Sequence, residues 1–283
     1  MLPASTASFV KSVRAFSLST PDWAEAIRYF TKPDERTDIT LIAERVYGNR
    51  GEFMAVFAAA RFLVPLGPGR SRAMRRLVGA SPELLISRRG AAILSHPLAG
   101  SARRSPDLSE DEAAAQALLT SDKDRREHGF VVEAIMDLLA PWCSDLRAPP
   151  GPALVSTRTM WHLGTRIEGR LRRPDEGSAA ELAALLHPTP AVCGSPRDRA
   201  AELIRELEAY DRGFYAGAVG WTNAAGDGAW YVALRCAEVC GREARLYAGA
   251  GIVEGSDPEA EADETSGKFR AVLRALGVDE ASL

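Results

Sequence analysis

The stretch YAGAGIVEGSDPEAEADETSGK, residues 247–268, constrains the fold more than any other part of the chain. It begins like the end of a strand, continues through closely spaced glycines, and ends in an acidic segment with helical spacing. Gly249 and Gly251 predict a tight turn, because glycine tolerates backbone angles that other residues avoid. Exposed N–H groups in such a turn would suit a carboxylate or a phosphate. The stretch therefore predicts an anion-binding turn beside a helix.

The acidic part of this stretch, together with a second segment, indicates a metal site. Glu261, Glu264 and Lys268 are spaced i, i+3 and i+7, so on a helix they share one face. Asp124 and Glu127 repeat the acidic spacing at the start of an apolar helical period. A solvated helix face with a Glu–Lys pair would explain the first segment alone. Two acidic pairs on two helices suit Mg²⁺, which binds few carboxylates and keeps waters that a substrate carboxylate can replace.

Length and charge limit the class of protein. With 283 residues and 46% hydrophobic content, the chain can bury a substantial core, and we expect one domain. Its formal net charge of −3 gives no general attraction to nucleic acid or to anionic membranes, so neither is expected as a partner. No run approaches the roughly 20 apolar residues of a membrane helix. We expect a monomer that binds a small molecule.

The cysteines and the N-terminus bear on the compartment. Cys143, Cys193, Cys236 and Cys240 lack the CxxC spacing of metal knuckles, which predicts reduced core thiols in a cytoplasmic protein. Residues 1–21 contain no acid and faintly resemble an organelle transit peptide. A frayed or atypical N-terminus explains them equally well, so a cytoplasmic location is the expectation.

The order of predicted elements favours an α+β fold. Two strands flank a turn at residues 88–90, and three strand candidates between residues 214 and 253 predict an antiparallel meander. Residues 38–47 fit a strand or a helix equally. Helices are predicted at residues 21–30, 110–139, 179–186, 197–210 and 258–276.

Several ordered segments together resemble the chorismate-utilising enzymes, and most nearly the isochorismate synthases of the siderophore (2,3-dihydroxybenzoate) type. The segments are GASPELLIS, SHPLAGSARR, SDKDRREH, TMWHLGTRIEG, LHPTPAVCGSP, YDRGFYAGAVGW, YVALRCAEV, LYAGAGIV and DETSGKFR. The resemblance implies two largely antiparallel sheets flanked by helices, with a chorismate-binding catalytic core at residues 76–283. Residues 1–75 would be a divergent or truncated N-terminal segment of the same domain.

The resemblance also implies a role for each matching residue. The carboxylates that hold Mg²⁺ match Glu127 and Glu264, with Asp124 and Glu261 as supporting acids. Groups that hold substrate carboxylates match Lys268, Arg235, Tyr215 and Gly249. Residues lining the site match Gly100, Ser101 and Ala191. The general acid that protonates the departing 4-hydroxyl of chorismate matches Glu83.

Elementary chemistry is consistent with Glu83 as the general acid. A carboxylic acid can donate a proton at neutral pH only if burial or a neighbouring carboxylate raises its pKa, and Glu83 lies between apolar neighbours in SPELLI. Taken alone, Glu83 would be interpreted as a structural or loop carboxylate rather than as an acid catalyst. The histidines are interpreted as packing or hydrogen-bonded residues, because Mg²⁺ prefers oxygen; they are His96, His128, His162 and His187.

These inferences make isochorismate synthase the leading hypothesis, with water added at C2 as the C4 hydroxyl leaves. The family takes its general base from a lysine that opens a strand of the form KVVLAR, and that motif is missing. Lys32 is a candidate by its separation from Glu83, and Lys11 is a weaker one. Salicylate or anthranilate synthase chemistry remains open, as does a truncated, non-catalytic relative that only binds.

Overall fold

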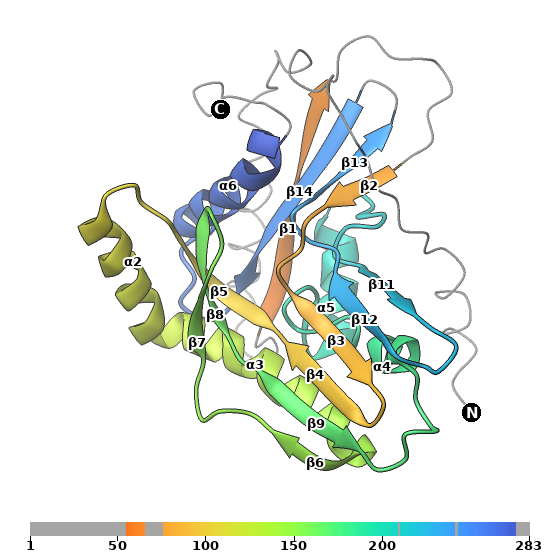
Figure 1. Ribbon diagram of the computed structural model, residues 1–283. Helices are drawn as coiled ribbons and strands as arrows, with labels where there is room; N and C mark the ends of the chain where they lie inside the picture. The colour runs from red at the N-terminus through yellow and green to blue at the C-terminus, as the bar shows by residue number, and fades with distance from the viewer. Residues whose placement is uncertain (1–54, 66–75, 209, 241–242, 276–283) are drawn as a thin grey trace.

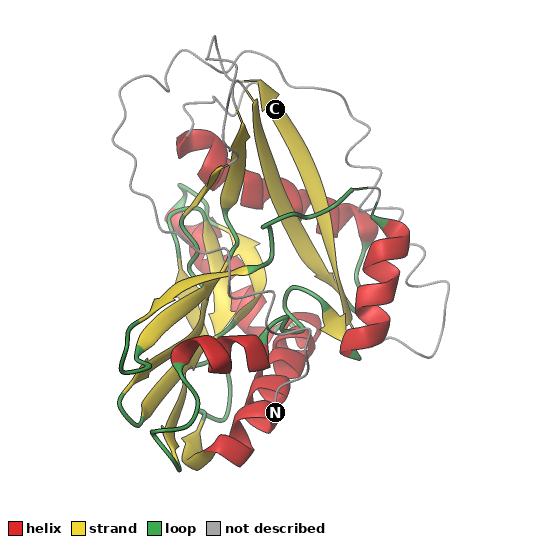
Figure 2. Ribbon diagram, turned by 90° about the vertical axis from the view of Figure 1, so that its right-hand side faces the viewer, coloured by secondary structure: helices red, strands yellow, loops and turns green. Residues whose placement is uncertain are grey.

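The computed structural model describes residues 55–65, 76–208, 210–240 and 243–275. The helix predicted at residues 21–30, the segment 38–47 and the candidate bases Lys11 and Lys32 lie outside the described residues. Within the described ranges, helices and antiparallel strands are mixed along the chain (Figure 1; Figure 2), which confirms the predicted α+β class.

The strands are short, except for two that reach ten residues or more. In chain order they are β1 Ala55–Pro65, β2 Arg76–Gly79, β3 Leu84–Arg89, β4 Ala92–His96, β5 Leu98–Arg103, β6 Cys143–Arg147, β7 Ala153–Ser156, β8 Met160–Gly164, β9 Ile167–Leu171, β10 Gly194–Ser195, β11 Ala218–Thr222, β12 Gly228–Val232, β13 Cys236–Cys240 and β14 Glu243–Ile252. The predicted hairpin around residues 88–90 is confirmed as β3 and β4.

These strands form three antiparallel sheets. The orders are β10-β1-β14-β13-β2, β11-β12-β3-β4-β9-β6 and β5-β8-β7. The long strands β1 and β14 lie side by side along their whole length in the first sheet (Figure 1), with Val56 paired to Ile252 at one end and Pro65 to Glu243 at the other. The small third sheet lies between the helical part of the molecule and the other two sheets, and it carries part of the site.

The helices agree with the predictions in most places. They are α2 Leu108–Thr120, α3 Asp122–Leu139, the 3-10 turn η3 Ala140–Trp142, α4 Ala179–Leu186, α5 Arg197–Leu207 and α6 Pro258–Ala275. The predicted helix at residues 179–186 is confirmed, and Ser178 caps it in a capping box with Glu181. The helix predicted to reach residue 210 ends at Leu207, because Glu208 is extended.

The single helix predicted at residues 110–139 is wrong. Ser121 is extended (φ −66°, ψ 117°) and separates α2 from α3. Its side chain accepts a hydrogen bond from the backbone N–H of Asp124, which is the capping geometry that serine favours over a helix interior. The break makes Ser121 the N-cap of a new helix, so Asp124 and Glu127 lie in the first two turns of α3.

The main core lies between the six-stranded sheet and helices α3 and α4. The inward face of α3 presents Val131, Ile135 and Leu139, which are buried and spaced about one turn apart. Against them pack buried side chains of the sheet and of α4, including Leu85, Ile86, Ile93, Ile167, Leu182, Leu186 and Val232. This packing fixes the direction of α3, and with it the position of the acidic residues at its start.

The predicted three-stranded meander is also wrong. The segment GAWYVALRCAEV does not form one strand, because β12 belongs to the six-stranded sheet and β13 to the five-stranded sheet. The chain crosses between the sheets at Arg235, which has a positive φ of 49°. Such backbone conformations are uncommon for residues other than glycine and often occur at functional positions. The crossing places the Arg235 side chain between the two sheets.

Two predictions from composition are tested in part. Cys143, Cys193 and Cys236 are free and buried, as expected for core thiols. Among the helices in the described ranges, none has the length and hydropathy needed to cross a membrane.

Candidate active site

Strand β5 forms the axis of the candidate site, because successive residues of it contact different functional side chains. The backbone of Leu98 hydrogen-bonds to the Glu83 carboxyl, and the backbone of Gly100 hydrogen-bonds to His162. The Ser101 hydroxyl donates to Glu264 Oε1 over 2.6 Å. Helices α3 and α6 both pack against this strand. Acidic groups from distant parts of the chain therefore meet around it.

Glu83 is held at one side of the site by the start of β3. Its side chain is only 2% exposed, and its backbone carbonyl accepts a hydrogen bond from Val232. Burial raises the pKa of Glu83 to about 8, although Arg235, the backbone of Leu98 and Lys268 each act to lower it. The side chain is therefore largely protonated at neutral pH, as a general acid must be.

Arg235 lies beside Glu83, and its side chain is half-buried. Burial lowers its pKa, while Tyr215, Glu264 and Glu83 act in the opposite direction. One guanidinium nitrogen, Nη2, lies 3.5 Å from His162 Nε2. Burial, then Arg235 and Lys268, lower the pKa of His162 to about 3, so this imidazole is neutral at neutral pH. Because the neutral His162 does not compensate the positive charge of Arg235, this guanidinium can still bind an anionic ligand.

Tyr215 supports this side of the site from behind. Its ring stacks on Tyr247 of β14 with a centroid distance of 5.0 Å and an interplanar angle of 13°. Burial raises the pKa of Tyr215 above its usual value, even though Arg212 acts to lower it, so the phenol stays neutral. Neutral Tyr215 next to the crossing at Arg235 contributes packing and a hydroxyl dipole rather than a charge.

The opposite side of the site is a cluster of carboxylates from α3 and α6. Burial, and then repulsion from Glu264, raise the pKa of Glu127 to about 8. Burial and repulsion from Glu264 also raise the pKa of Glu261, which is 1% exposed. Asp124 lies at the edge of this cluster, where burial raises its pKa too. The fold therefore brings together acidic residues of α3 and α6, which are far apart in the sequence.

Two lysines compensate the charge of the cluster. Lys268 Nζ lies 2.6 Å from Glu264 Oε1 and donates to the carbonyl of Gly249 over 2.8 Å. Lys123, one turn before Glu127 on α3, forms an ion pair with Glu261 on α6 and so links the two helices. Burial of Glu264 would raise its pKa, but Lys268 and the Ser101 hydroxyl lower it, so this carboxylate stays ionised.

The anion-binding turn predicted at Gly249 and Gly251 is wrong. Both glycines lie inside β14 and pair with Ala59 and Phe57 of β1, because the strand continues to Ile252. Gly251 allows the close approach of a neighbour. A Cβ atom on Gly251 would lie 2.1 Å from Glu127 Oε1, so only glycine leaves room for that carboxylate.

Most of the predicted residues line one cavity. Its walls are formed by Pro82, Glu83, Leu98, Ala99, Gly100, Ser101, Glu127, His162, Ala191, Leu234, Arg235, Gly249 and Lys268. Asp124, Tyr215, Glu261 and Glu264 lie behind these walls rather than in them. The cavity has a volume of about 40 Å³, well below the roughly 300 Å³ at the lower end for ligand pockets, so a ring compound would require its lining side chains to move apart.

A larger hollow, of about 730 Å³, lies over the six-stranded sheet and shares no lining residue with this cavity. Its charged side chains are partly engaged with each other, since Arg147 pairs with Asp145 and Arg166 with Glu168. All four of these side chains are largely exposed. Three groups with strongly shifted pKa values, Glu83, Glu127 and His162, line the smaller cavity, and no group with so large a shift lines the larger hollow. We therefore place the candidate site at the smaller cavity.

The acidic cluster has the donor chemistry of a site for a hard cation. Glu127, Glu261 and Glu264 are carboxylates that repel one another, and oxygen is the ligand that Mg²⁺ prefers. In the described ranges, however, no three acidic, histidine or cysteine side chains are grouped closely enough to hold a metal ion as they stand. Lys123 and Lys268 are bonded to two of these carboxylates. The residues fit a cation by type and charge.

His162 is buried and hydrogen-bonded to the backbone of Gly100, as interpreted from the sequence, and it also lines the cavity next to Arg235. Lys123 was not singled out, although its position one turn before Glu127 could have suggested it. The other interpretations of histidines agree with the structure: His128 bonds Thr165 Oγ1 over 2.7 Å, and His187 bonds the Ala216 carbonyl over 2.8 Å.

Comparison with known proteins shows the family of this chain. Residues 70–277 match the protein family described as "Chorismate binding enzyme", and the chain belongs to that family. It is 56% identical over 205 residues to isochorismate synthase DhbC of Bacillus subtilis (strain 168), covering 72% of this chain and 51% of that protein. It is 45% identical over 217 residues to isochorismate synthase EntC of Escherichia coli (strain K12), covering 77% and 54%. The chain spans about half the length of the curated relatives it matches.

Solved structures show the same relation. A Bacillus anthracis protein assigned as 2,3-dihydroxybenzoate-specific isochorismate synthase DhbC superposes with a TM-score of 0.82 at 39% identity, over 87% of this chain and 72% of that one. Anthranilate synthase component I from Streptococcus pneumoniae superposes with a TM-score of 0.73 at 24% identity, which shows a shared fold. The predicted family is therefore confirmed.

Proposed function

We propose that this protein is an isochorismate synthase that isomerises chorismate with the help of Mg²⁺ and supplies siderophore (2,3-dihydroxybenzoate) biosynthesis. The observation that carries the proposal is the pairing of a protonated Glu83 and a half-buried Arg235 on one side of a cavity with a carboxylate cluster on the other. The identities to DhbC and EntC support the reaction and the pathway.

The cationic groups of the cavity would hold the substrate. Chorismate carries two carboxylates, and Arg235 and Lys268 both line the cavity. A guanidinium can bind a carboxylate through two parallel hydrogen bonds, which fixes orientation as well as charge. Gly100, Ser101, Ala191 and Gly249 would form the walls around the ring. Tyr215 would act from behind by packing next to Arg235.

Glu83 would supply the proton for the leaving group. Its protonated carboxyl donates to the C4 oxygen of chorismate as the C4–O bond breaks, so the hydroxyl leaves as water. A second water forms the new C–O bond at C2 and loses its proton to a base, while the ring double bonds shift between the two carbons. Glu83 is left as a carboxylate beside Arg235, and this cation stabilises the charge that develops.

Glu127 and Glu264 would hold the metal ion, with Asp124 and Glu261 behind them. The ion, when bound, neutralises a substrate carboxylate and polarises the ring attached to it. The chain itself prepares these ligands. Ser101 and Lys268 fix the Glu264 carboxylate, and Gly251 leaves space for that of Glu127.

The general base is the part of the mechanism that stays a sequence prediction. A lysine is the expected base. Among the described residues that line the cavity, the lysine present is Lys268, and its ammonium is paired with Glu264. Lys32, the candidate from sequence, lies outside the described residues. The missing KVVLAR motif keeps a second candidate function open, in which the chain binds chorismate and Mg²⁺ without turning the substrate over.

The remaining choices within the family rest on resemblance. Ala191 lines the cavity and fits the branch that uses water better than the branches that eliminate pyruvate or use ammonia. We propose a cytoplasmic monomer, with no nucleic acid or membrane partner.

Turnover by the purified chain tests the proposal directly. Chorismate would be incubated with the protein and Mg²⁺, with and without ammonium, and the products separated by chromatography. Isochorismate under both conditions is the expected result. Salicylate, or anthranilate with ammonium, would assign another branch. Chorismate binding without any product would establish the non-catalytic function, and loss of turnover in Lys32→Ala would identify the base.

A further inference from the structure

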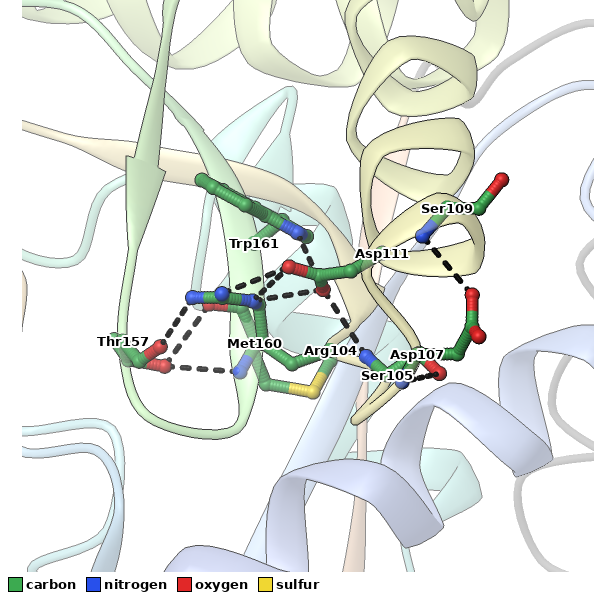
Figure 3. A network of polar contacts seen from close by, with 8 residues as sticks. All are labelled: Arg104, Ser105, Asp107, Ser109, Asp111, Thr157, Met160 and Trp161. Carbon is green, nitrogen blue, oxygen red and sulfur yellow. Dashed lines mark hydrogen bonds and ion pairs between the residues drawn. The ribbon is translucent and has the colours of Figure 1, made fainter.

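A buried polar network lies next to the candidate site but outside the cavity (Figure 3). Asp111 of α2 is 5% exposed, and its carboxylate accepts hydrogen bonds from three other residues. Arg104 Nε lies 2.8 Å from its Oδ1, the backbone N–H of Ser105 lies 3.0 Å away, and Trp161 Nε1 also lies 3.0 Å away. The Arg104 guanidinium stacks over the Trp161 ring at 4.2 Å.

The same network joins three elements. Arg104 follows the last residue of β5, Asp111 lies in α2, and Trp161 is the second residue of β8. Arg104 also donates from Nη1 to the Thr157 carbonyl over 3.3 Å and from its backbone N–H to the Thr159 carbonyl over 3.0 Å. It therefore grips the turn between β7 and β8. The end of β5 is fixed against both the hairpin and the helix.

This anchoring matters because β5 contains an irregularity in the middle of the site. Its pairing with β8 shifts between Ala99 and Ser101, and Gly100 between them has a φ of 76°. At such a bulge, one residue is left unpaired and the ladder is locally disrupted. Beyond it, Ser101 pairs with His162, and the next pair is Ala102 with Trp161. The network thus begins one residue pair away from the site.

A slip of one residue would place the Ser101 side chain on the opposite face of the sheet, because side chains alternate along a strand. The hydrogen bond to Glu264 would then be lost. Before the bulge, the bond between Leu98 and Glu83 holds the strand. After the bulge, the ladder with β8 runs from Ser101 to Arg103, and the Arg104 contacts fix its end.

We propose that Asp111 is a positioning residue for the carboxylate cluster: through Arg104 and Trp161 it fixes the register of β5 beyond Gly100 and so aims the Ser101 hydroxyl at Glu264. The inference goes beyond the proposed function, and its metal readout rests on the part of that function that gives the cluster a Mg²⁺ ion. Asp111, which does not line the cavity, thereby controls the position of the Glu264 carboxylate.

A double-mutant cycle tests this chain of contacts. The variants are Asp111→Asn, Ser101→Ala and the double mutant, and the readout is the Mg²⁺ midpoint, which is the free Mg²⁺ concentration at half-saturation in a calorimetric titration. Each single change is expected to raise that concentration about 10-fold, since residues that orient metal ligands typically contribute 10–100-fold to affinity. The double mutant should also lie near 10-fold, because both changes break the same contact.

The control is Asp107→Ala, which removes the N-cap of the same helix without touching β5 or β8. It should lower the melting temperature and leave the Mg²⁺ midpoint within about 2-fold. If Asp111→Asn does not fold, Arg104→Lys replaces it, because lysine keeps the charge but cannot form the forked contact. A 100-fold change in the double mutant, or an unchanged midpoint in Asp111→Asn, would overturn the proposal.

A second measurement reports the register whether or not Mg²⁺ binds. In a deuterated, ¹⁵N-labelled protein, the cross-strand contact between Ser101 and His162 should be present in the unmodified chain and in Asp107→Ala, and lost in Asp111→Asn. Persistence of that contact in Asp111→Asn would refute the positioning role. Loss of the contact in a protein that shows no response to Mg²⁺ would instead uphold the register control and count against the metal site.

Discussion

Glu83 and Glu127 face the same cavity from opposite sides, and in both the pKa is raised to about 8, but for different reasons. For Glu83, burial alone raises the pKa, and Arg235 is the main group that acts against it. For Glu127, burial is joined by repulsion from Glu264. One acid is isolated among apolar groups next to a cation, and the other belongs to a crowded anionic cluster.

This difference teaches how one cavity can contain an acid and a metal ligand at the same pH. A divalent cation in the cluster would remove the repulsion that acts on Glu127 and favour its ionised form. Glu83 has no such neighbour, because its nearby charges are Arg235 and Lys268. Burial would keep it protonated. The two carboxyls therefore separate into a proton donor and a ligand through their surroundings.

The largest expected effect comes from removing the proton donor, Glu83. Glu83→Gln should lower kcat by about 10³-fold and change KM little, because a positioned general acid typically contributes 10²–10⁴-fold. In the unmodified protein, kcat should fall as the pH rises through about 8, since only the protonated carboxyl can donate. The measurement is the rate of chorismate consumption from pH 6 to 9.

The matched control for this variant is Glu133→Gln on the exposed face of α3, which should keep full activity at every pH. An active Glu83→Gln protein with an unchanged pH profile would remove Glu83 from the mechanism.

A smaller effect separates the two acids by their response to Mg²⁺. Glu127→Gln should lose most of the stabilisation that the ion gives, whereas Glu83→Gln should keep it. At a free Mg²⁺ concentration 100 times its dissociation constant, that stabilisation is about 2.7 kcal/mol. Without Mg²⁺, Glu127→Gln should be the more stable protein, because it removes one member of a repelling buried cluster.

Thermal unfolding with and without Mg²⁺ measures this difference, with Ca²⁺ as a test of specificity. Equal stabilisation of both variants would show that Glu127 is not a ligand and would remove the distinction drawn between the two acids.

The smallest expected effect concerns the space around Glu127. Gly251→Ala should displace the Glu127 carboxylate, because the added Cβ would lie 2.1 Å from Oε1. We expect a loss of stability of about 1–3 kcal/mol, the usual range for overpacking, and a weaker response to Mg²⁺. Urea unfolding measures the first effect. Gly90→Ala, where a Cβ meets nothing within 4 Å but φ is 58°, controls for backbone strain alone. A Gly251→Ala protein that matches the unmodified chain in both assays would contradict this role of the glycine.

The sequence was sufficient for much of the fold and for most of the residues that line the candidate cavity. The helix at residues 179–186 was predicted with its bounds, and the α+β class followed from the mixture of periodicities. The acidic spacing on two helices located Glu127 and Glu264 before any geometry was known. These signals are local, because helical spacing and capping act over a few residues.

The errors share a cause in longer-range packing. Gly249 and Gly251 suggested a turn, but β14 extends through them because β1, nearly two hundred residues earlier in the chain, pairs along that segment. The segment around Arg235 looked like one strand, but its two halves belong to different sheets. A strand propensity does not state which partner a strand will have.

By itself, the sequence determined which residue types would meet: carboxylates on two helices, a lysine one turn beyond, and an acid between apolar neighbours. Only the tertiary structure decided that Lys123 would bond to the opposite helix, that His162 would face Arg235, and that burial would raise the pKa of Glu83. The physical reason is that charge, burial and pairing partners depend on neighbours distant in the chain, whereas periodicity is written into adjacent residues.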